Sequence, residues 1–213
     1  HRLVAIITLA MKIPFQKAQH PFTLIIFGAS GSLARLKIYP ALYQLFLEKR
    51  ITVSCNVGGY GRKQITTAQF QREIAEAVEK KYRDTTDKKI LNQLLKIVSY
   101  QAGSYDRTED YDALKSHLMK VEKPGQRRVR MAYFSVPPSV FEPIIRNLGE
   151  LTIRNAACPL RLIIEKPFGY DEASAHALEK LLRHYFDEEN FFLLDHYLGK
   201  EAVFNILSLR YAN

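Results

Sequence analysis

The sequence has little cysteine, no long apolar run and no low-complexity segment. Its two cysteines, Cys55 and Cys158, are too few and too irregularly placed for a disulfide framework or a zinc cluster, and such sparse thiols are typical of a reducing compartment. No stretch reaches the ~20 consecutive apolar residues that a membrane-spanning helix requires. We therefore expect a cytoplasmic protein that does not cross a membrane and holds no metal cluster.

The composition is typical of a globular protein. With 213 residues, of which 47% are hydrophobic, the chain can bury a sizeable core and is near the upper end of the size of a single domain. It begins with His1, and Met11 is the expected natural start. We therefore expect residues 1–20 to be a leader or an extension that expression added, and residues 21–213 to form one domain.

The formal net charge of +9 predicts an anionic partner, which could be nucleic acid, an acidic membrane surface or a phosphorylated small molecule. The densest basic cluster is Arg127, Arg128 and Arg130, and it runs directly into an apolar segment. We expect these arginines to be solvated residues at the start of a strand rather than a nucleic-acid-binding arm. A basic nucleic-acid-binding domain is accordingly the least favoured class.

Short apolar runs rich in β-forming residues alternate with segments of helical periodicity. Strands are expected over 23–27, 51–57, 129–136 and 160–164, with Gly58 and Gly59 closing the second. Helices are expected over 33–49, with a kink or a restart at Pro40, and over 68–82, 88–98, 111–121, 140–148 and 172–186. This alternation predicts an α/β fold with a doubly wound, mostly parallel Rossmann-type sheet and helices on both faces.

A glycine-rich turn stands between the first predicted strand and the first predicted helix. Glycine allows the backbone to approach a phosphate closely, the small Ala34 allows the helix to pack on the strand, and the N–H groups at the helix start point toward an anion. The turn is predicted to bind a dinucleotide pyrophosphate, and a merely structural tight turn is the alternative. Its candidate ligand-binding residues are Gly28, Ala29, Ser30, Gly31, Ser32 and Leu33.

The end of the second predicted strand lacks the acidic residue that binds an adenosine ribose 2′-hydroxyl. Arg62 and Lys63 stand there instead. A guanidinium can bind a 2′-phosphate through two hydrogen bonds, whereas a carboxylate would repel it. NADP is therefore favoured over NAD. Two solvated cations in a loop are the alternative interpretation.

Two later segments, 161–169 and 194–201, each follow an apolar, strand-like run and are rich in reactive side chains. In open α/β sheets, ligands bind beyond the carboxyl ends of the strands. Ordinary surface or core residues are the alternative at each single position, but together the side chains make a donor-rich site suited to a phosphate monoester. They are Lys166, His196, Tyr197 and Lys200.

In combination and in order, these motifs resemble glucose-6-phosphate dehydrogenase, and the resemblance runs from about Phe22 to the end of the chain. The matching segments are Gly28-Ala-Ser-Gly-Ser-Leu-Ala34, Lys37-Ile-Tyr-Pro40, Gly59-Tyr-Gly-Arg62, Val136-Pro-Pro138, Glu165-Lys-Pro-Phe-Gly169 and Asp195-His-Tyr-Leu-Gly-Lys-Glu201. The last two are the most specific, because the others are shared in part with other dinucleotide enzymes.

The resemblance implies an oxidoreductase of the pentose phosphate pathway that moves a hydride from C1 of glucose 6-phosphate to NADP and gives 6-phosphogluconolactone. The turn from Gly28 to Ala34 would bind the pyrophosphate, Arg62 the 2′-phosphate, and Pro137 would border the nicotinamide. Lys166 would contact both cofactor and sugar. The sugar phosphate would be bound by His196, Tyr197 and Lys200.

The family places its catalytic base, a His–Asp dyad, and most of its dimer contacts in a C-terminal α+β domain that would begin near Asn213. We therefore expect this chain to be a fragment or short isoform with no catalytic residue of its own and without the usual dimer interface. An inactive nucleotide-binding or regulatory module is the alternative. The histidines that fall in helical patterns are expected on the surface, namely His117, His176 and His184.

Two positions depart from the family pattern. Ser32 stands where the family usually has an acidic residue, and a serine there can still cap the helix start. Leu193 stands where the family usually has a basic residue, which removes a charge next to the proposed substrate site.

Overall fold

The computed structural model describes residue 18 and residues 20–151 and 158–194. These residues form a six-stranded sheet in the order β3-β2-β1-β4-β5-β6, and every neighbouring pair is parallel. The predicted doubly wound α/β fold is thereby confirmed. The strands are β1 (Phe22–Phe27), β2 (Cys55–Gly61), β3 (Val98–Ala102), β4 (Val129–Phe134), β5 (Leu160–Glu165) and β6 (Phe191–Leu194).

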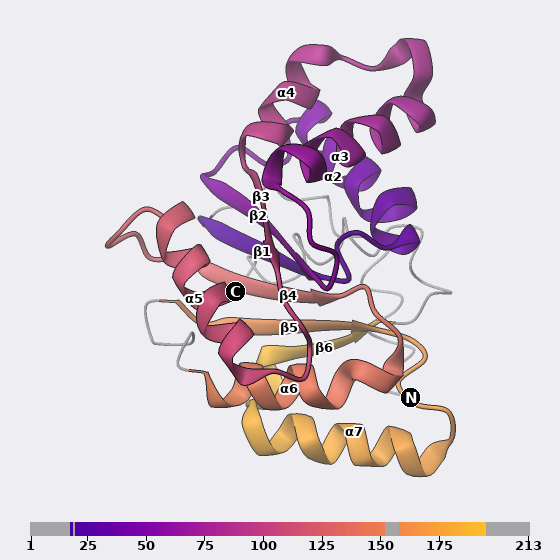
Figure 1. Ribbon diagram of the computed structural model, residues 1–213, viewed down its shortest axis with the longest axis vertical. Coiled ribbons are helices and arrows are strands. Elements are labelled where there is room, and N and C mark those ends of the chain that lie inside the picture. Colours follow the sequence, from indigo (N-terminus) through magenta and orange to yellow (C-terminus); the bar gives the residue numbers. More distant parts are fainter. Residues whose placement is uncertain (1–17, 19, 152–157, 195–213) are drawn as a thin grey trace, which may run out of the picture.

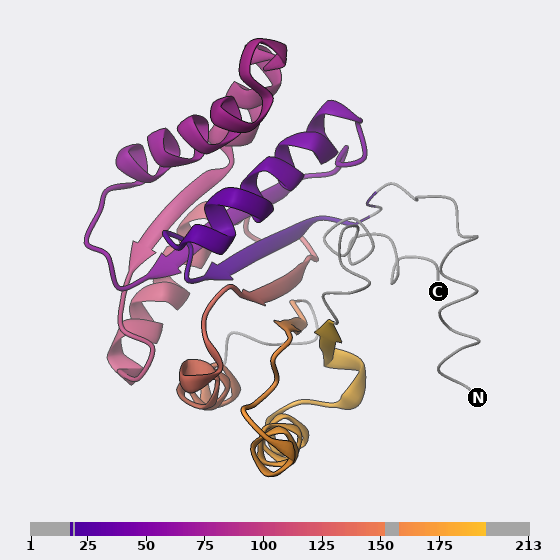
Figure 2. The same cartoon turned by 90° about the vertical axis from the view of Figure 1, so that its right-hand side faces the viewer.

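Helices cover both faces of the sheet (Figures 1 and 2). One face carries α2 (Tyr39–Leu47), α3 (Thr67–Tyr82) and α4 (Lys88–Lys96), and the other carries α5 (Thr108–Val121), α6 (Phe141–Glu150) and α7 (Glu172–Tyr185). The split arises because right-handed crossovers place helices on opposite faces when the chain winds outward in opposite directions from β1 and β4. Within the part of the chain described, no helix is long and apolar enough to cross a membrane.

Strand β1 lies at the centre of the sheet and is buried along its whole length. Its side chains alternate between two hydrophobic cores, with Ile26 facing the α2–α4 side and Ile25 and Phe27 facing the α5–α7 side. Each such side chain contributes about 1.5–3 kcal/mol when it is fully buried. The continuous apolar run of β1 is therefore explained by burial on both faces, as predicted.

The structure corrects two predictions about strands. The helix expected over 88–98 ends at Lys96, and Val98 starts β3, which the sequence did not predict because its polar residues suit a half-exposed edge strand. Strand β2 does not end at Gly58 and Gly59 but continues to Gly61. A Cβ on Gly59 would lie 2.6 Å from Cζ of Phe70, so glycine there allows α3 to approach the sheet closely.

The helix expected over 33–49 contains an irregular turn. A π-helical segment, η1 (Ala34–Ile38), precedes α2, and the Tyr39 backbone N–H donates to the carbonyl of Ala34. Pro40 has no N–H to donate and is tolerated because it lies in the first turn of α2. Regular α-helix therefore restarts at Tyr39, after a π-helical segment that ends two residues before the proline. Three short 3-10 helices complete the structure: η2 (Arg83–Thr85), η3 (Pro138–Val140) and η4 (Glu188–Asn190).

The prediction that the basic cluster before β4 is solvated is wrong for two of its three arginines. Arg128 is only 2% exposed and Arg130 only 8%. Arg130 binds Glu122 through Nη2–Oε2 at 2.6 Å and Nε–Oε1 at 3.0 Å, while Thr23 donates to Oε1 of the same carboxylate at 2.8 Å. The arginines are thus part of a buried polar network at the amino end of the sheet, which sequence reasoning could not anticipate because its partners lie on β1 and after α5.

The expected surface position of His117 is also only partly correct, because its side chain is half-buried between α5 and β3. Nε2 of His117 lies 2.9 Å from Oγ of Ser99. Burial lowers the pKa of His117, and the nearby charge of Lys120 lowers it further. His176 and His184 are exposed, as predicted.

Replacing His117 with glutamine should flatten the dependence of stability on pH. Because the folded state depresses the pKa of His117 below the usual value of about 6.5, the unfolded chain binds more protons between those two values, so the free energy of unfolding should fall on acidification through that range. Urea unfolding between about pH 7 and about pH 5 would measure the slope in both proteins. Equal slopes would contradict a role for His117.

Candidate functional site

The carboxyl ends of β1, β2, β4 and β5 meet at one edge of the sheet. The strand order reverses between β1 and β4, since the chain winds from β1 toward β3 and from β4 toward β6. This reversal is the topological switch point at which ligands bind in open α/β sheets. The loops that emerge there are residues 28–34 (the glycine turn), 62–63, 135–138 and 166–169.

The glycine turn is held tightly against the ends of β2 and β4. Gly28 has a positive φ of 77°, and a Cβ at this position would lie 2.2 Å from the Ser135 carbonyl oxygen. The N–H groups of Gly28 and Ala29 both donate to the carbonyl of Tyr60, at 3.0 and 3.3 Å, and Gly31 N–H donates to the Gly28 carbonyl at 2.8 Å. Only glycine fits at position 28, because both the backbone conformation and the space exclude a side chain.

Helical backbone begins at Ser32, within the second half of the glycine turn. The first intrahelical hydrogen bond runs from Arg35 N–H to the Gly31 carbonyl at 3.2 Å. The N–H groups of Ser32 and Leu33 therefore belong to the first turn, which has no intrahelical acceptors and carries a partial positive charge. A tight glycine turn followed by a helix start is the arrangement that accepts a pyrophosphate in this fold class.

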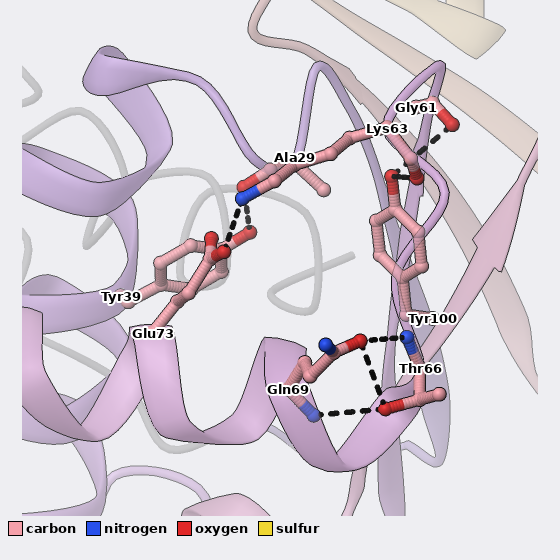
Figure 3. A network of polar contacts seen from close by, with 8 residues as sticks. All are labelled: Ala29, Tyr39, Gly61, Lys63, Thr66, Gln69, Glu73 and Tyr100. Carbon is pink, nitrogen blue, oxygen red and sulfur yellow. Dashed lines mark hydrogen bonds and ion pairs between the residues drawn. The ribbon is translucent and has the colours of Figure 1, made fainter.

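Tyr39 of α2 supports the glycine turn through a hydrogen bond. Tyr39 Oη donates to the Ala29 carbonyl at 2.6 Å (Figure 3). The Tyr39 ring meets Phe70 of α3 edge to face, at 5.7 Å between centroids. Burial raises the pKa of Tyr39 well above its usual value, so the hydroxyl stays protonated as a donor. The motif around Lys37 and Pro40 thus contributes a supporting residue, Tyr39.

Tyr100 on β3 holds the end of β2. Its hydroxyl donates to the carbonyls of Gly61 and Lys63, at 3.1 and 2.9 Å (Figure 3). Burial raises the pKa of Tyr100 to about 12, although a hydrogen bond with Ser30 of the glycine turn opposes the shift. Tyr100 therefore ties the glycine turn to the loop that carries Arg62.

The structure separates the two cations that follow β2. Lys63 forms an ion pair with Glu73 of α3 (Figure 3). Arg62 is exposed, and its guanidinium carbon lies 5.8 Å from the centroid of the Tyr105 ring. Among the described residues, no carboxylate lies within ion-pair distance of Arg62. Arg62 is thus the cation that can receive an anionic group at this edge.

Tyr105 is a site residue that the sequence prediction missed. It follows β3 and is 7% exposed beneath Arg62. Burial raises the pKa of Tyr105, while the charge of Arg62 and a hydrogen bond from the Gly28 backbone lower it. The signal that could have found it is an aromatic residue just past the carboxyl end of a strand, and that signal was lost because β3 itself was not predicted.

The residues on the other side of the switch point follow β4 and β5. Ser135 N–H donates to the Phe27 carbonyl at 2.9 Å, which sets the start of the loop that carries Pro137, and Pro137 is exposed. Lys166 is exposed after β5, its N–H donates to the Leu194 carbonyl at 2.9 Å, and its Nζ lies 6.0 Å from the Phe168 ring centroid. The structure therefore places Pro137 and Lys166 at the same edge as the glycine turn.

The remaining predicted substrate residues, His196, Tyr197 and Lys200, lie outside the described residues. Leu193 lies on β6 opposite Ile164 of β5 and is 41% exposed. Its side chain supplies no charge at the end of the sheet, in keeping with the departure noted in the sequence.

A cavity of about 590 Å³ lies between α6 and α7. Its walls include Phe141, Phe168, Leu178 and Leu181, with Lys180 and His184 at its rim. Neither Arg62 nor any residue of the glycine turn lines it. The candidate site is therefore the loop cluster at the strand ends rather than this cavity.

The chain is similar to known proteins along most of its length. A family model described as the glucose-6-phosphate dehydrogenase NAD binding domain matches residues 25–205. Glucose-6-phosphate 1-dehydrogenases of Schizosaccharomyces pombe and Saccharomyces cerevisiae are each 38% identical to this chain, over 190 and 191 residues. These alignments cover 89% and 88% of this chain but 38% and 37% of the relatives, so the chain spans about two fifths of their length.

Solved structures give the same result. A glucose-6-phosphate dehydrogenase in complex with its substrate glucose-6-phosphate superposes with a TM-score of 0.77 at 35% identity, covering 95% of this chain and 41% of that one. The enzyme from Mycobacterium avium superposes with a TM-score of 0.72 at 32% identity, covering 92% and 40%.

Proposed function

The chain belongs to the glucose-6-phosphate dehydrogenase family, and from this premise we propose that residues 21–213 form an NADP-binding domain of an enzyme that oxidises glucose 6-phosphate. The family model describes a nucleotide-binding domain. The observation that carries the choice of NADP is Arg62, an exposed guanidinium at the end of β2, where an NAD site would present an acidic residue. Within the part of the chain that the structure describes, Arg62 forms no ion pair with a carboxylate.

The residues at the switch point fit a dinucleotide. A Cβ on Gly28 would lie 2.2 Å from the Ser135 carbonyl oxygen and 2.7 Å from the Val136 side chain, and one on Gly31 would lie 2.9 Å from the Gly28 carbonyl oxygen, so glycine at both positions keeps the turn tight. In the proposal, the residues from Gly28 to Leu33 hold the pyrophosphate and Arg62 holds the 2′-phosphate. Pro137 and Lys166 border the nicotinamide side. When bound, the nicotinamide supplies the hydride acceptor of the reaction.

The substrate proposal rests on the relatives, one of which was solved in complex with glucose-6-phosphate. We propose the same substrate here, with 6-phosphogluconolactone as the product. Lys166 would bind the sugar, and its position after β5 places a cation on the side of the switch point away from Arg62. His196, Tyr197 and Lys200 would bind the phosphate. The catalytic base is proposed to lie beyond residue 213.

Calorimetric titration of the chain with NADP and with NAD tests the proposal. NADP should bind more tightly than NAD, and Arg62→Ala should weaken NADP binding by about 10- to 100-fold, because hydrogen bonds to charged groups are worth about 1.5–3 kcal/mol each. NAD lacks the 2′-phosphate, so its affinity should change little in the variant.

Lys63→Ala is the matched control, since Lys63 is the neighbouring cation but already pairs with Glu73. It should weaken NADP binding much less than Arg62→Ala. The proposal would be rejected if the folded chain bound neither nucleotide, or if the two variants weakened NADP and NAD equally.

A further inference from the structure

The short loop after β3 is held in place by side chains from three other elements. Tyr60 of β2 donates its hydroxyl to the Ser104 carbonyl at 2.8 Å. The Tyr105 carbonyl accepts two hydrogen bonds, from Tyr111 Oη of α5 at 2.9 Å and from Asn147 Nδ2 of α6 at 3.3 Å. The peptide groups on both sides of Tyr105 are therefore fixed by donors from the protein interior.

Asn147 lies 42 positions beyond Tyr105 in the sequence and is only 6% exposed. Its Nδ2 also donates to the Pro143 carbonyl at 2.9 Å, and its Oδ1 accepts from Thr108 Oγ1 at 2.9 Å. Both donor hydrogens and the acceptor of this buried amide thus have partners. Because a buried amide is costly unless it is satisfied, its orientation is well defined, and it contacts both ends of the segment from Tyr105 to Thr108.

The ring of Tyr105 is fixed in the same way as its backbone. It lies among other aromatic side chains, with its centroid 6.1 Å from that of Tyr60 and 6.4 Å from that of Phe27. The guanidinium carbon of Arg62 lies over this ring, 5.8 Å from its centroid. A chain of contacts therefore runs from α6 through Tyr105 to the cation proposed to bind the 2′-phosphate.

We propose that Asn147 is a positioning residue for NADP recognition, which acts by fixing Tyr105 and, through its ring, the guanidinium of Arg62. The inference rests on the proposed NADP binding. A long arginine side chain loses rotamer freedom when it binds, and a fixed aromatic surface beneath it reduces that loss before the ligand arrives. Asn147 touches no proposed ligand-binding residue directly and influences only the 2′-phosphate end of the site.

Titration of the Asn147→Leu variant with NADP and NAD tests the inference. The dissociation constant for NADP should rise about three- to tenfold, the range expected when a cation–π contact and its preorganisation are lost, and that for NAD should stay unchanged. In an Arg62→Ala background the same substitution should have no further effect on NADP, because the two residues act through one contact.

Two further variants serve as an independent probe of the same loop and as a control for stability. Tyr111→Phe removes the other hydrogen bond to the Tyr105 carbonyl while keeping the ring, and it should also weaken NADP selectively even if Asn147→Leu does not fold. Ile144→Val removes one methyl group from the buried face of the same helix without touching the loop, so it should alter stability but not the ratio of NADP to NAD affinity.

The outcomes distinguish a failure of the proposed NADP binding from a failure of the inference about Asn147. If the unaltered chain bound no NADP, the proposed function would fail and the inference with it. If the unaltered chain bound NADP but Asn147→Leu and Tyr111→Phe left the affinity unchanged, or weakened NADP and NAD equally, the inference alone would be overturned.

Discussion

Gly28→Ala should abolish nucleotide binding and lower the free energy of unfolding by roughly 2–5 kcal/mol. A left-handed backbone costs a non-glycine residue about 1–2 kcal/mol, and overfilling a tight contact adds about 1–3 kcal/mol. Both effects apply, because φ is 77° and the new Cβ would meet the Ser135 carbonyl oxygen at 2.2 Å. Relief of this clash requires the glycine turn to move away from β4, which would distort the cradle for the pyrophosphate.

Gly125→Ala is a matched control for this prediction. Gly125 also has a positive φ, 71°, but nothing lies within 4 Å of the Cβ that would be added. This variant should therefore lose only about 1–2 kcal/mol and keep full affinity for NADP. Urea unfolding and calorimetric titration measure both quantities, and equal losses of stability and affinity in the two variants would show that the close contact at Gly28 has no special role.

Glu122→Ala should lower the free energy of unfolding by about 3–5 kcal/mol, the range typical when one partner of a buried ion pair is removed. Glu122 is 8% exposed and is the acidic partner of Arg130, whose side chain is also buried. Burial disfavours the charge on Arg130, but hydrogen bonding to Glu122 and its negative charge outweigh that effect and raise the pKa of the guanidinium. The variant would leave Arg130 charged in the interior without this carboxylate.

Glu142→Ala provides the comparison at the surface. Glu142 pairs with Arg146 on the exposed side of α6, where side chains are 65% and 50% exposed, and such pairs are worth about 0–1 kcal/mol. Chemical denaturation of both variants gives the two free energies directly. A loss below about 1 kcal/mol for Glu122→Ala would mean that the interior network relaxes or admits water after the carboxylate is removed.

Motifs that depend on short-range sequence order were predictable. The apolar run of β1, the glycine turn after it and the amphipathic helices require only neighbouring residues, so the sequence predicted them within a few positions. The order of strands and helices then led to the doubly wound sheet, because crossover handedness leaves few alternatives. The position of Arg62 just past a strand followed from the same reasoning, although that strand begins and ends four residues later than predicted.

Features that depend on contacts between distant segments were not predictable. Thr23 and Glu122 are 99 positions apart, and no local pattern shows that the arginines before β4 would be buried with them. The continuation of β2 to Gly61 places Gly59 against Phe70 of α3, and β3 is recognisable only from its pairing with β2. Each is a property of two segments that meet only when the sheet assembles.

By itself, the sequence determined the class of the fold, the family and the place of the phosphate-binding turn, because these follow from local backbone preferences and from residue types in a fixed order. Only the tertiary structure decided which of the two cations after β2 is available and which residues lie beneath it. Lys63 forms an ion pair with Glu73 of α3. Tyr105, whose carbonyl accepts a hydrogen bond from Asn147 of α6, lies under Arg62. Availability of a charge depends on its neighbours in space, and those neighbours come from helices far along the chain.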